Sequence, residues 1–212
     1  MTQPATQSSI WSSSVTEAVE SPRFETMSGR MPSDVFHPVS ETIIHTGAVI
    51  DFRQVVIGDS DGKRFARDVI RHPGAVSIIP FDGTNVTLVR QYRAAIDGDL
   101  FEIPAGKRDV RSEPPEITAR RELAEEVGLE AAEVEFLVNM HHSPGFCDEY
   151  GFIFVARGLS PVPVDREGPE EQAMTLHTVP LDDAVTMCLD GRITDSKSMI
   201  GLMALSIHEG RS

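Results

Sequence analysis

The chain has 212 residues, of which 40% are hydrophobic, and it carries a formal net charge of −14 at pH 7. This length and composition suit one globular domain with short additions. The acidic balance excludes a general nucleic-acid-binding surface, and no apolar run reaches the ~20 residues of a transmembrane helix, so we expect neither a nucleic-acid nor a membrane partner.

The first 36 residues are rich in Ser, Thr, Pro and Gln and show no sustained hydrophobic period. We therefore expect residues 1–36 to form a disordered tail. They also lack the basic region and apolar stretch that mark a secretory signal. Cys147 and Cys188 lie in unrelated contexts and are expected to be free thiols of a cytoplasmic protein, with a disulfide as the open alternative.

Residues 38–72 have the pattern of an N-terminal β-strand subdomain. Residues 46–57 are rich in β-branched side chains, residues 58–62 form a turn cluster, and residues 63–70 resume an extended pattern. This order predicts an antiparallel β-hairpin. Because two or three strands alone are barely stable in water, we expect this subdomain to pack against another surface.

Residues 73–209 alternate short strands with three helices, which predicts a mixed α/β (α+β) domain. Strands are predicted at 75–81, 86–92, 100–103, 133–140, 151–156 and 175–179, and helices at 115–127, 181–189 and 196–208. The first helix is expected to turn Ile117, Leu123, Ala124 and Val127 inward and to stop at Gly128. The last helix is expected to turn Met199, Ile200, Met203, Ala204 and Ile207 inward.

Three carboxylates lie close together on the first of these helices. At ~100° per residue, Glu122 and Glu126 lie one turn apart and Glu125 lies beside both. Such like-charged neighbours repel, although a glutamate-rich helix face is often only solvated. Hard oxygen ligands without a neighbouring cation favour Mg²⁺ or Mn²⁺.

The residues framing these glutamates form a longer motif. Arg121-Glu-Leu-Ala-Glu-Glu-Val-Gly-Leu129 follows Glu113 by eight positions, and Gly106 lies in the preceding loop. This motif resembles the Nudix box of hydrolases that cleave nucleoside diphosphates linked to another group. Six residues separate Gly106 from Glu113, one more than in the family pattern. We interpret this as an extra loop residue, and the alternative is that Ser112 takes the place of Glu113.

The resemblance extends to the ADP-ribose pyrophosphatase subfamily. Its marks are Gln91-Tyr92-Arg93, the segment Phe101-Glu-Ile-Pro-Ala-Gly106, and Pro144, which lies 16 positions after Gly128 in a Ser-Pro-Gly loop. The resemblance implies a Nudix-type α/β/α sandwich with a mixed sheet. It also implies a homodimer in which the N-terminal β-hairpin subdomain packs onto the partner, so that residues 38–72 serve dimerisation and residues 73–209 form the hydrolase domain.

The resemblance further implies roles for individual residues. The expected metal ligands are Glu122, Glu126, Glu125 and the carbonyl of Ala105. Arg121 and Glu113 are expected to support them, and the general base is expected to be Glu171, with Glu170 as the reserve. The expected substrate contacts are Arg93, Glu102, Phe146 and Asp148, together with Arg53 and Arg67 reaching into a partner's pocket.

The implied activity is Mg²⁺-dependent hydrolysis of the pyrophosphate bond of ADP-ribose to AMP and ribose 5-phosphate. One alternative is hydrolysis of another nucleoside-diphosphate derivative, such as a nucleoside-diphosphate sugar, NADH, a diadenosine polyphosphate or an oxidised nucleotide. Another is a non-catalytic module that senses ADP-ribose. The intact glutamates favour an enzyme over the sensing module.

Overall fold

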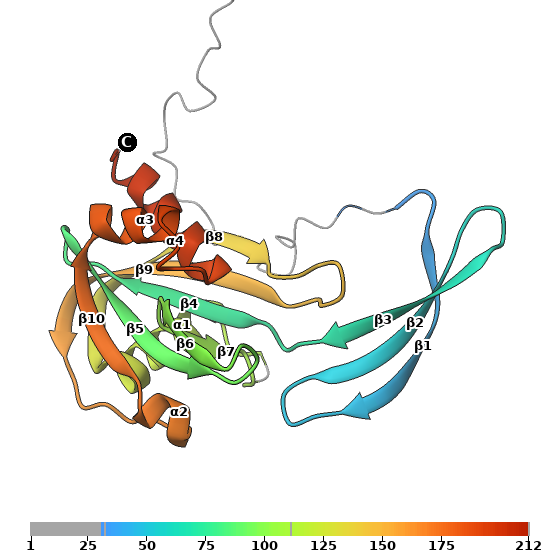
Figure 1. Cartoon of the computed structure of the whole chain (residues 1–212), viewed down its shortest axis with the longest axis horizontal. Helices are drawn as coiled ribbons and strands as arrows, with labels where there is room; N and C mark the ends of the chain where they lie inside the picture. Colours follow the sequence, from blue (N-terminus) through green and yellow to red (C-terminus); the bar gives the residue numbers. More distant parts are fainter. Residues whose placement is uncertain (1–30, 32, 111, 212) are drawn as a thin grey trace, which may run out of the picture. The chain divides into compact units, whose positions relative to one another are not determined.

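The computed structural model describes residues 31, 33–110 and 112–211. Of the expected disordered tail, residues 1–30 and 32 lie outside the described residues. The described chain has a mixed α/β fold with three sheets (Figure 1), as the sequence predicts. Within these residues, no helix combines the length and the apolar character needed to cross a membrane.

The N-terminal sheet contains three antiparallel strands, β1 (His37–Thr46), β2 (Asp51–Gly58) and β3 (Arg64–Arg71). The β2–β3 pair confirms the predicted hairpin. Its turn is stabilised by the Asp59 carboxylate, which accepts from the backbone N–H groups of Asp61 and Lys63. Strand β1 was not predicted, because all ten of its residues are exposed and it lacks the burial alternation that marks a strand.

A four-stranded mixed sheet has the order β7-β4-β9-β8. Its strands are β7 (Ala105–Lys107), β4 (Ala75–Pro80), β9 (Tyr150–Pro161) and β8 (Leu129–His141), and only the β4–β9 pair is parallel. All six residues of β4 are buried. An apolar strand of this kind is typical of a sheet covered on both faces. Helices α1 (Pro115–Glu122) and α4 (Ser196–His208) both contact β4 and β9, from opposite sides in Figure 1.

A three-stranded antiparallel sheet has the order β10-β5-β6. Its strands are β10 (Thr175–Pro180), β5 (Asn85–Arg93) and β6 (Gly98–Glu102). The main core lies between these strands, the mixed sheet and the helices α3 (Leu181–Leu189) and α4 (Ser196–His208). Its fully buried side chains include Phe81, Ile153, Leu181 and Leu202.

The inward face of α4 differs from the prediction. Ile200 and Ile207 are 39% and 77% exposed, so their inward assignment was wrong. The buried face is centred on Gly201, where a β-carbon would lie 3.1 Å from Ile153. Because this close approach favours glycine, the helix turns Gly201 and its leucines toward the core and its isoleucines outward. The buried positions are Lys197, Ser198, Gly201, Leu202 and Leu205.

The glutamate-bearing helix has two parts. α1 (Pro115–Glu122) is continued by the π-helical turn η2 (Leu123–Val127), and the predicted stop at Gly128 has the left-handed φ of 72° that favours glycine. Leu123 and Val127 are buried as expected, but Ile117 is 49% exposed, contrary to the prediction. Further along, the short helix α2 (Gly168–Gln172) lies between the strands predicted at 151–156 and 175–179, where no helix was predicted.

Candidate active site

A cavity of about 730 Å³ lies beside the glutamate-bearing helix. Its walls come from β5, β6, β7, α1, η2, the segment 167–171 and the start of α4. Ten carboxylate side chains and four Lys or Arg side chains line it, so the excess of negative charge is six. The carboxylates are Glu102, Asp109, Glu122, Glu125, Glu126, Glu149, Glu167, Glu170, Glu171 and Asp195, and the cations are Arg93, Lys107, Arg121 and Lys197.

Glu122 is packed directly against the backbone of β7. A β-carbon at Gly106 would overlap the carboxyl group of Glu122, so this position admits only glycine unless the glutamate moves. Burial, together with repulsion from Glu125 and Glu171, raises the pKa of Glu122 to about 7 in spite of the neighbouring Arg121. The structure therefore places a carboxylate where water alone stabilises its charge poorly.

Glu126 is buried more deeply, with 3% of its surface exposed. Its Oε2 accepts a hydrogen bond of 3.1 Å from the backbone N–H of Ala105. Burial and the charge of Glu122 raise the pKa of Glu126 to about 8. The carbonyl of Ala105 belongs to the same short strand that carries Gly106, so β7 meets both glutamates.

Arg121 joins two of the glutamates. Its Nη1 lies 3.0 Å from Glu122 Oε1 and 2.8 Å from Glu125 Oε2. Its Nη2 lies 3.9 Å from Glu113 Oε2, and that carboxylate also accepts a 2.7 Å hydrogen bond from Thr118 Oγ1. Glu113, and not the exposed Ser112, thus faces Arg121, which favours the extra loop residue over the alternative alignment.

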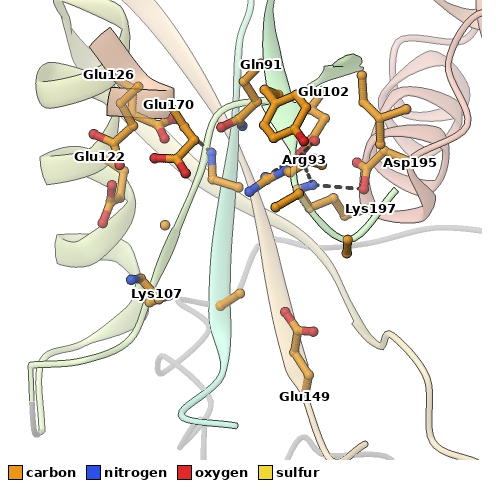
Figure 2. Close-up of a pocket in the computed structure, with 18 of the residues that line it drawn as sticks. Gln91, Arg93, Glu102, Lys107, Glu122, Glu126, Glu149, Glu170, Asp195 and Lys197 are labelled. Atoms are coloured by element: carbon orange, nitrogen blue, oxygen red, sulfur yellow. Dashed lines mark hydrogen bonds and ion pairs between the residues drawn. The ribbon is translucent and has the colours of Figure 1, made fainter. Parts of the chain in front are cut away.

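The segment before β10 is held against the same helix. Arg166 donates from Nε to the carbonyl of Glu126 at 2.9 Å and from Nη1 to the carbonyl of Met174 at 2.9 Å. These bonds bring Glu170 and Glu171 to the cavity wall. Figure 2 shows Glu170 on the side of the cavity where Glu122 and Glu126 lie. The carboxylate of Glu171 accepts a 2.8 Å hydrogen bond from the N–H of Glu167.

Arg93 and Glu102 form a bidentate pair on the strands β5 and β6. Arg93 donates to Glu102 from Nε at 2.7 Å and from Nη2 at 2.6 Å. The Arg93 side chain is 41% exposed, whereas the Glu102 side chain is 1% exposed. The guanidinium therefore faces the cavity, and the carboxylate lies behind it.

The remaining expected substrate residues do not line the cavity of the described chain. Arg53 pairs with Asp51 at 2.5 Å, and Arg67 lies over the ring of Phe65. Phe146 is 59% exposed. Asp148 instead ties its loop to the N-terminal sheet, because it pairs with Arg71 at 3.1 Å and accepts from the backbone N–H of His72 at 2.9 Å.

Several cavity residues were not identified from the sequence: Gln91, Lys107, His72, His142, Glu149, Asp195 and Lys197. Glu149 lies one position after Asp148, so the loop that was expected to contact the substrate reaches the cavity through the neighbouring carboxylate. The sequence offered only a weak indication that Lys197 lies at the site. It is a lysine two positions after Asp195, a residue type that often caps the start of a helix. Its partner Glu102 lies 95 residues away in sequence.

The chemistry of the donors fits a divalent cation. Glu122 and Glu126 are buried carboxylates whose pKa values are raised first by burial and then by neighbouring carboxylates, and a bound cation would offset both effects by favouring the ionised form. Among the residues that the structure describes, no three His, Cys, Asp or Glu side chains already form a group that could hold a metal ion.

Comparisons with known proteins agree with this arrangement. Residues 71–199 match the NUDIX domain model. The chain is 38% identical over 171 residues to an ADP-ribose pyrophosphatase of Mycobacterium tuberculosis (strain ATCC 25618 / H37Rv), covering 80% of this chain and 83% of that one. It is 36% identical over 167 residues to a methanol dehydrogenase activator of Bacillus methanolicus, covering 78% and 90%.

A solved structure, described as an ADP compounds hydrolase, resembles the fold of this chain. The TM-score is 0.74 at 20% sequence identity, and the match covers 86% of this chain and all of the other. At this identity the likeness concerns the fold alone.

Proposed function

The chain belongs to the NUDIX domain family, and from this premise we propose that it hydrolyses the pyrophosphate bond of ADP-ribose to AMP and ribose 5-phosphate. The observation that carries the proposal is the buried pair Glu122 and Glu126, which lines a cavity of about 730 Å³ together with Glu170 and Glu171. The substrate is supported by the similarity to the mycobacterial ADP-ribose pyrophosphatase over most of both chains.

Members of this family generally use divalent metal ions, and we propose Mg²⁺ here, with Mn²⁺ as the alternative. The proposed ligands are Glu122, Glu126, Glu125 and the carbonyl of Ala105. When bound, the cation stabilises charge on the phosphoryl oxygens and lowers the pKa of the attacking water. Arg121 holds the carboxylates in place through the ion pairs described above, and Glu113 supports Arg121.

Glu171 is the proposed general base, with Glu170 as the reserve. The base must accept a proton from water close to the metal ligands, and both residues lie on the cavity wall beside Glu122 and Glu126. The contacts of Arg166 with Glu126 and Met174 support this role, because they fix the spacing between the loop and the helix.

Arg93 is the proposed contact for the substrate's phosphates. Its exposed guanidinium lies close enough to Glu126 to lower the pKa of that carboxyl, so an anion between them would meet Arg93 on one side and the metal ligands on the other. Glu102 then acts by orienting Arg93. Phe146 and Asp148 remain proposals for the loop that bounds the terminal-ribose side.

A homodimer is part of the proposal, with residues 38–72 as the dimerisation subdomain and residues 73–209 as the hydrolase domain. It is supported by β1, whose ten residues are all exposed, including Val39, Ile43 and Ile44. In such a dimer Arg53 and Arg67 would reach the partner's pocket. A cytoplasmic location is also proposed, and the two free cysteines Cys147 and Cys188 support it.

The test is a hydrolysis assay with ADP-ribose, ADP-glucose, NADH and diadenosine polyphosphates in Mg²⁺, with products separated by chromatography. We expect AMP and ribose 5-phosphate from ADP-ribose at the highest kcat/KM. A Glu126→Gln variant should lose at least about 100-fold in kcat if Glu126 holds the metal. An inactive ADP-ribose reaction beside an active NADH reaction would refute the substrate, and an active Glu126→Gln variant would refute the metal assignment.

A further inference from the structure

Lys197 is a buried cation at the start of α4, 8% exposed and on the wall of the cavity. Its ammonium group is hydrogen-bonded to Oε2 of Glu102 and lies 2.9 Å from Oδ1 of Asp195. Asp195 caps α4 by accepting from the backbone N–H of Ser198 at 3.0 Å. A lysine is almost never this buried unless it is paired, so its place here needs a reason.

That reason begins with Glu102, whose side chain is 1% exposed. Burial opposes its ionisation, but the hydrogen bonds from Arg93 and the charge of Lys197 keep the pKa of Glu102 below its ordinary value. The carboxylate is therefore ionised and shared between two cations. With Asp195 included, two positive and two negative groups balance in this part of the wall, so that no buried charge is left unpaired.

The shared carboxylate fixes the plane of the Arg93 guanidinium. Two of its nitrogens, Nε and Nη2, donate to Glu102. Among the contacts of the described residues, the third nitrogen, Nη1, has no hydrogen bond that would draw it away from the cavity. Figure 2 shows Arg93 between two groups of side chains, Glu122 and Glu126 on one side and Lys197 and Asp195 on the other. Arg93 is thus held from behind, with its free donors on the side of the cavity where Glu126 lies.

The helix itself is anchored without the lysine. The backbone N–H of Ile103 donates to Ser198 Oγ at 2.8 Å, and Ser198 Oγ donates to Asp195. Gly201 packs tightly against the core one turn further on. Removing the lysine charge would therefore leave the backbone contacts of α4 in place and act mainly on Glu102.

We propose that Lys197 is a positioning residue for the substrate's diphosphate: by holding the buried Glu102 it fixes the Arg93 guanidinium in the orientation that binds the phosphates. The inference rests on the proposed function for the identity of the substrate. It goes beyond it by placing part of the binding machinery on the C-terminal helix, far in sequence from the glutamate motif.

The experiment is a double-mutant cycle of Lys197→Met and Arg93→Ala, measured with ADP-ribose and Mg²⁺. Methionine has a similar length and no charge. We expect Lys197→Met to raise KM about tenfold with a smaller change in kcat, because a lost ground-state contact acts on binding. In the Arg93→Ala background, Lys197→Met should raise KM by less than about twofold, since the lysine acts through the arginine. Equal effects in both backgrounds would overturn the proposal.

Lys63→Met is the matched control, because Lys63 is 69% exposed and has only a 3.8 Å pair with Asp61. It should keep the wild-type KM. If Lys197→Met does not fold, the double variant Glu102→Gln/Lys197→Met removes both buried charges together, and it should raise KM as Arg93→Ala does. A wild-type KM in that folded double variant would overturn the proposal.

The same cycle separates this inference from the proposed function. Wild-type protein that binds ADP-ribose in calorimetry without cleaving it would refute the hydrolase activity, and the cycle would then be read from dissociation constants with the same expected non-additivity. Wild-type protein that neither binds nor cleaves ADP-ribose would overturn both.

Discussion

Glu122 lies so close to Gly106 that any side chain at position 106 would occupy the space of its carboxyl group. The glycine of the loop and the glutamate of the helix therefore contact each other directly, and each depends on the other's size. It keeps the carboxylate against β7, where the carbonyl of Ala105 is also available. The spacing within the motif thus reflects a packing requirement as well as a chemical one.

Gly106→Ala should lower kcat at least about tenfold, because the added methyl group displaces Glu122 from its position beside β7, and a tenfold loss corresponds to only about 1.4 kcal/mol. Gly98→Ala is the control, since its β-carbon would come no closer than 3.8 Å to its neighbour. Steady-state kinetics over a Mg²⁺ series measures both. Wild-type kcat and Mg²⁺ dependence in Gly106→Ala would contradict the role of this contact.

The part of the site that the sequence predicts well is local. Glu122, Glu125 and Glu126 lie within five positions, so helical geometry alone places them together. The loop bearing Glu170 and Glu171 was also predicted to join them, through family resemblance and not through any local pattern. Its attachment depends on Arg166, whose bond to the carbonyl of Glu126 spans 40 residues.

The parts that were missed depend on tertiary packing. Lys197 pairs with Glu102 across 95 residues, and no local pattern announces such a pair. The inward face of α4 was misassigned because Gly201, which counts as neutral in a hydrophobic pattern, is the residue that approaches the core. Strand β1 was missed because its side chains are all exposed, so its sequence lacks the alternation of hydrophobic and polar residues that marks a half-buried strand.

The metal-free protein should become less stable as pH rises from about 6 to 8. Glu126 has a pKa raised from 4.5 to about 8 in the folded state, so the folded protein binds more protons than the unfolded chain in this range. The free energy of unfolding then falls as pH rises, by on the order of 1 kcal/mol per pH unit from Glu126, and Glu122, whose pKa is raised to about 7, adds a fall of the same sign at the lower end of this range. Urea denaturation in EDTA at several pH values measures this slope.

Glu126→Gln is the comparison for that slope, because it removes the titrating carboxyl while keeping its size. The variant should be more stable than wild type at pH 8 in EDTA and should show a flatter pH dependence above pH 6. Comparing the two proteins also cancels the effect of His142, whose lowered pKa acts in the opposite direction in wild type and variant alike. Parallel slopes would show that Glu126 is ionised throughout.

Glu171→Gln should lower kcat by about 10² to 10³, with little change in KM, if Glu171 is the general base. In the matched variant Glu170→Gln, kcat should fall by less than about tenfold, because this variant leaves Glu171, the proposed base, unchanged. Single-turnover rates across pH 6–9 distinguish the two. A larger loss of kcat in Glu170→Gln than in Glu171→Gln would assign the role of base to Glu170, which Figure 2 shows on the side of the cavity where Glu122 and Glu126 lie.

The exposed strand β1 carries the last prediction. Ile43 and Ile44 are 55% and 54% exposed, and Ile44 lies at an irregularity in the pairing of β1 with β2, between Ile43 and His45. A strand with exposed apolar side chains is costly in a free monomer and is explained if a second copy of the chain covers it. We therefore expect the wild-type protein to sediment as a dimer.

Aspartate in place of an isoleucine of β1 that the second copy covers should weaken this dimer, because a charge buried at an interface without a partner is strongly unfavourable. Ile43→Asp and Ile44→Asp are both needed, because the irregular pairing at this point interrupts the alternation that would assign the two side chains to opposite faces. Ile207→Asp is the matched control, because Ile207 is 77% exposed on α4, away from β1 in sequence and structure. At least one β1 variant should shift toward the monomer in sedimentation velocity while the control stays dimeric. A wild-type monomer, or a dimer unaffected by both β1 variants, would refute an interface on β1.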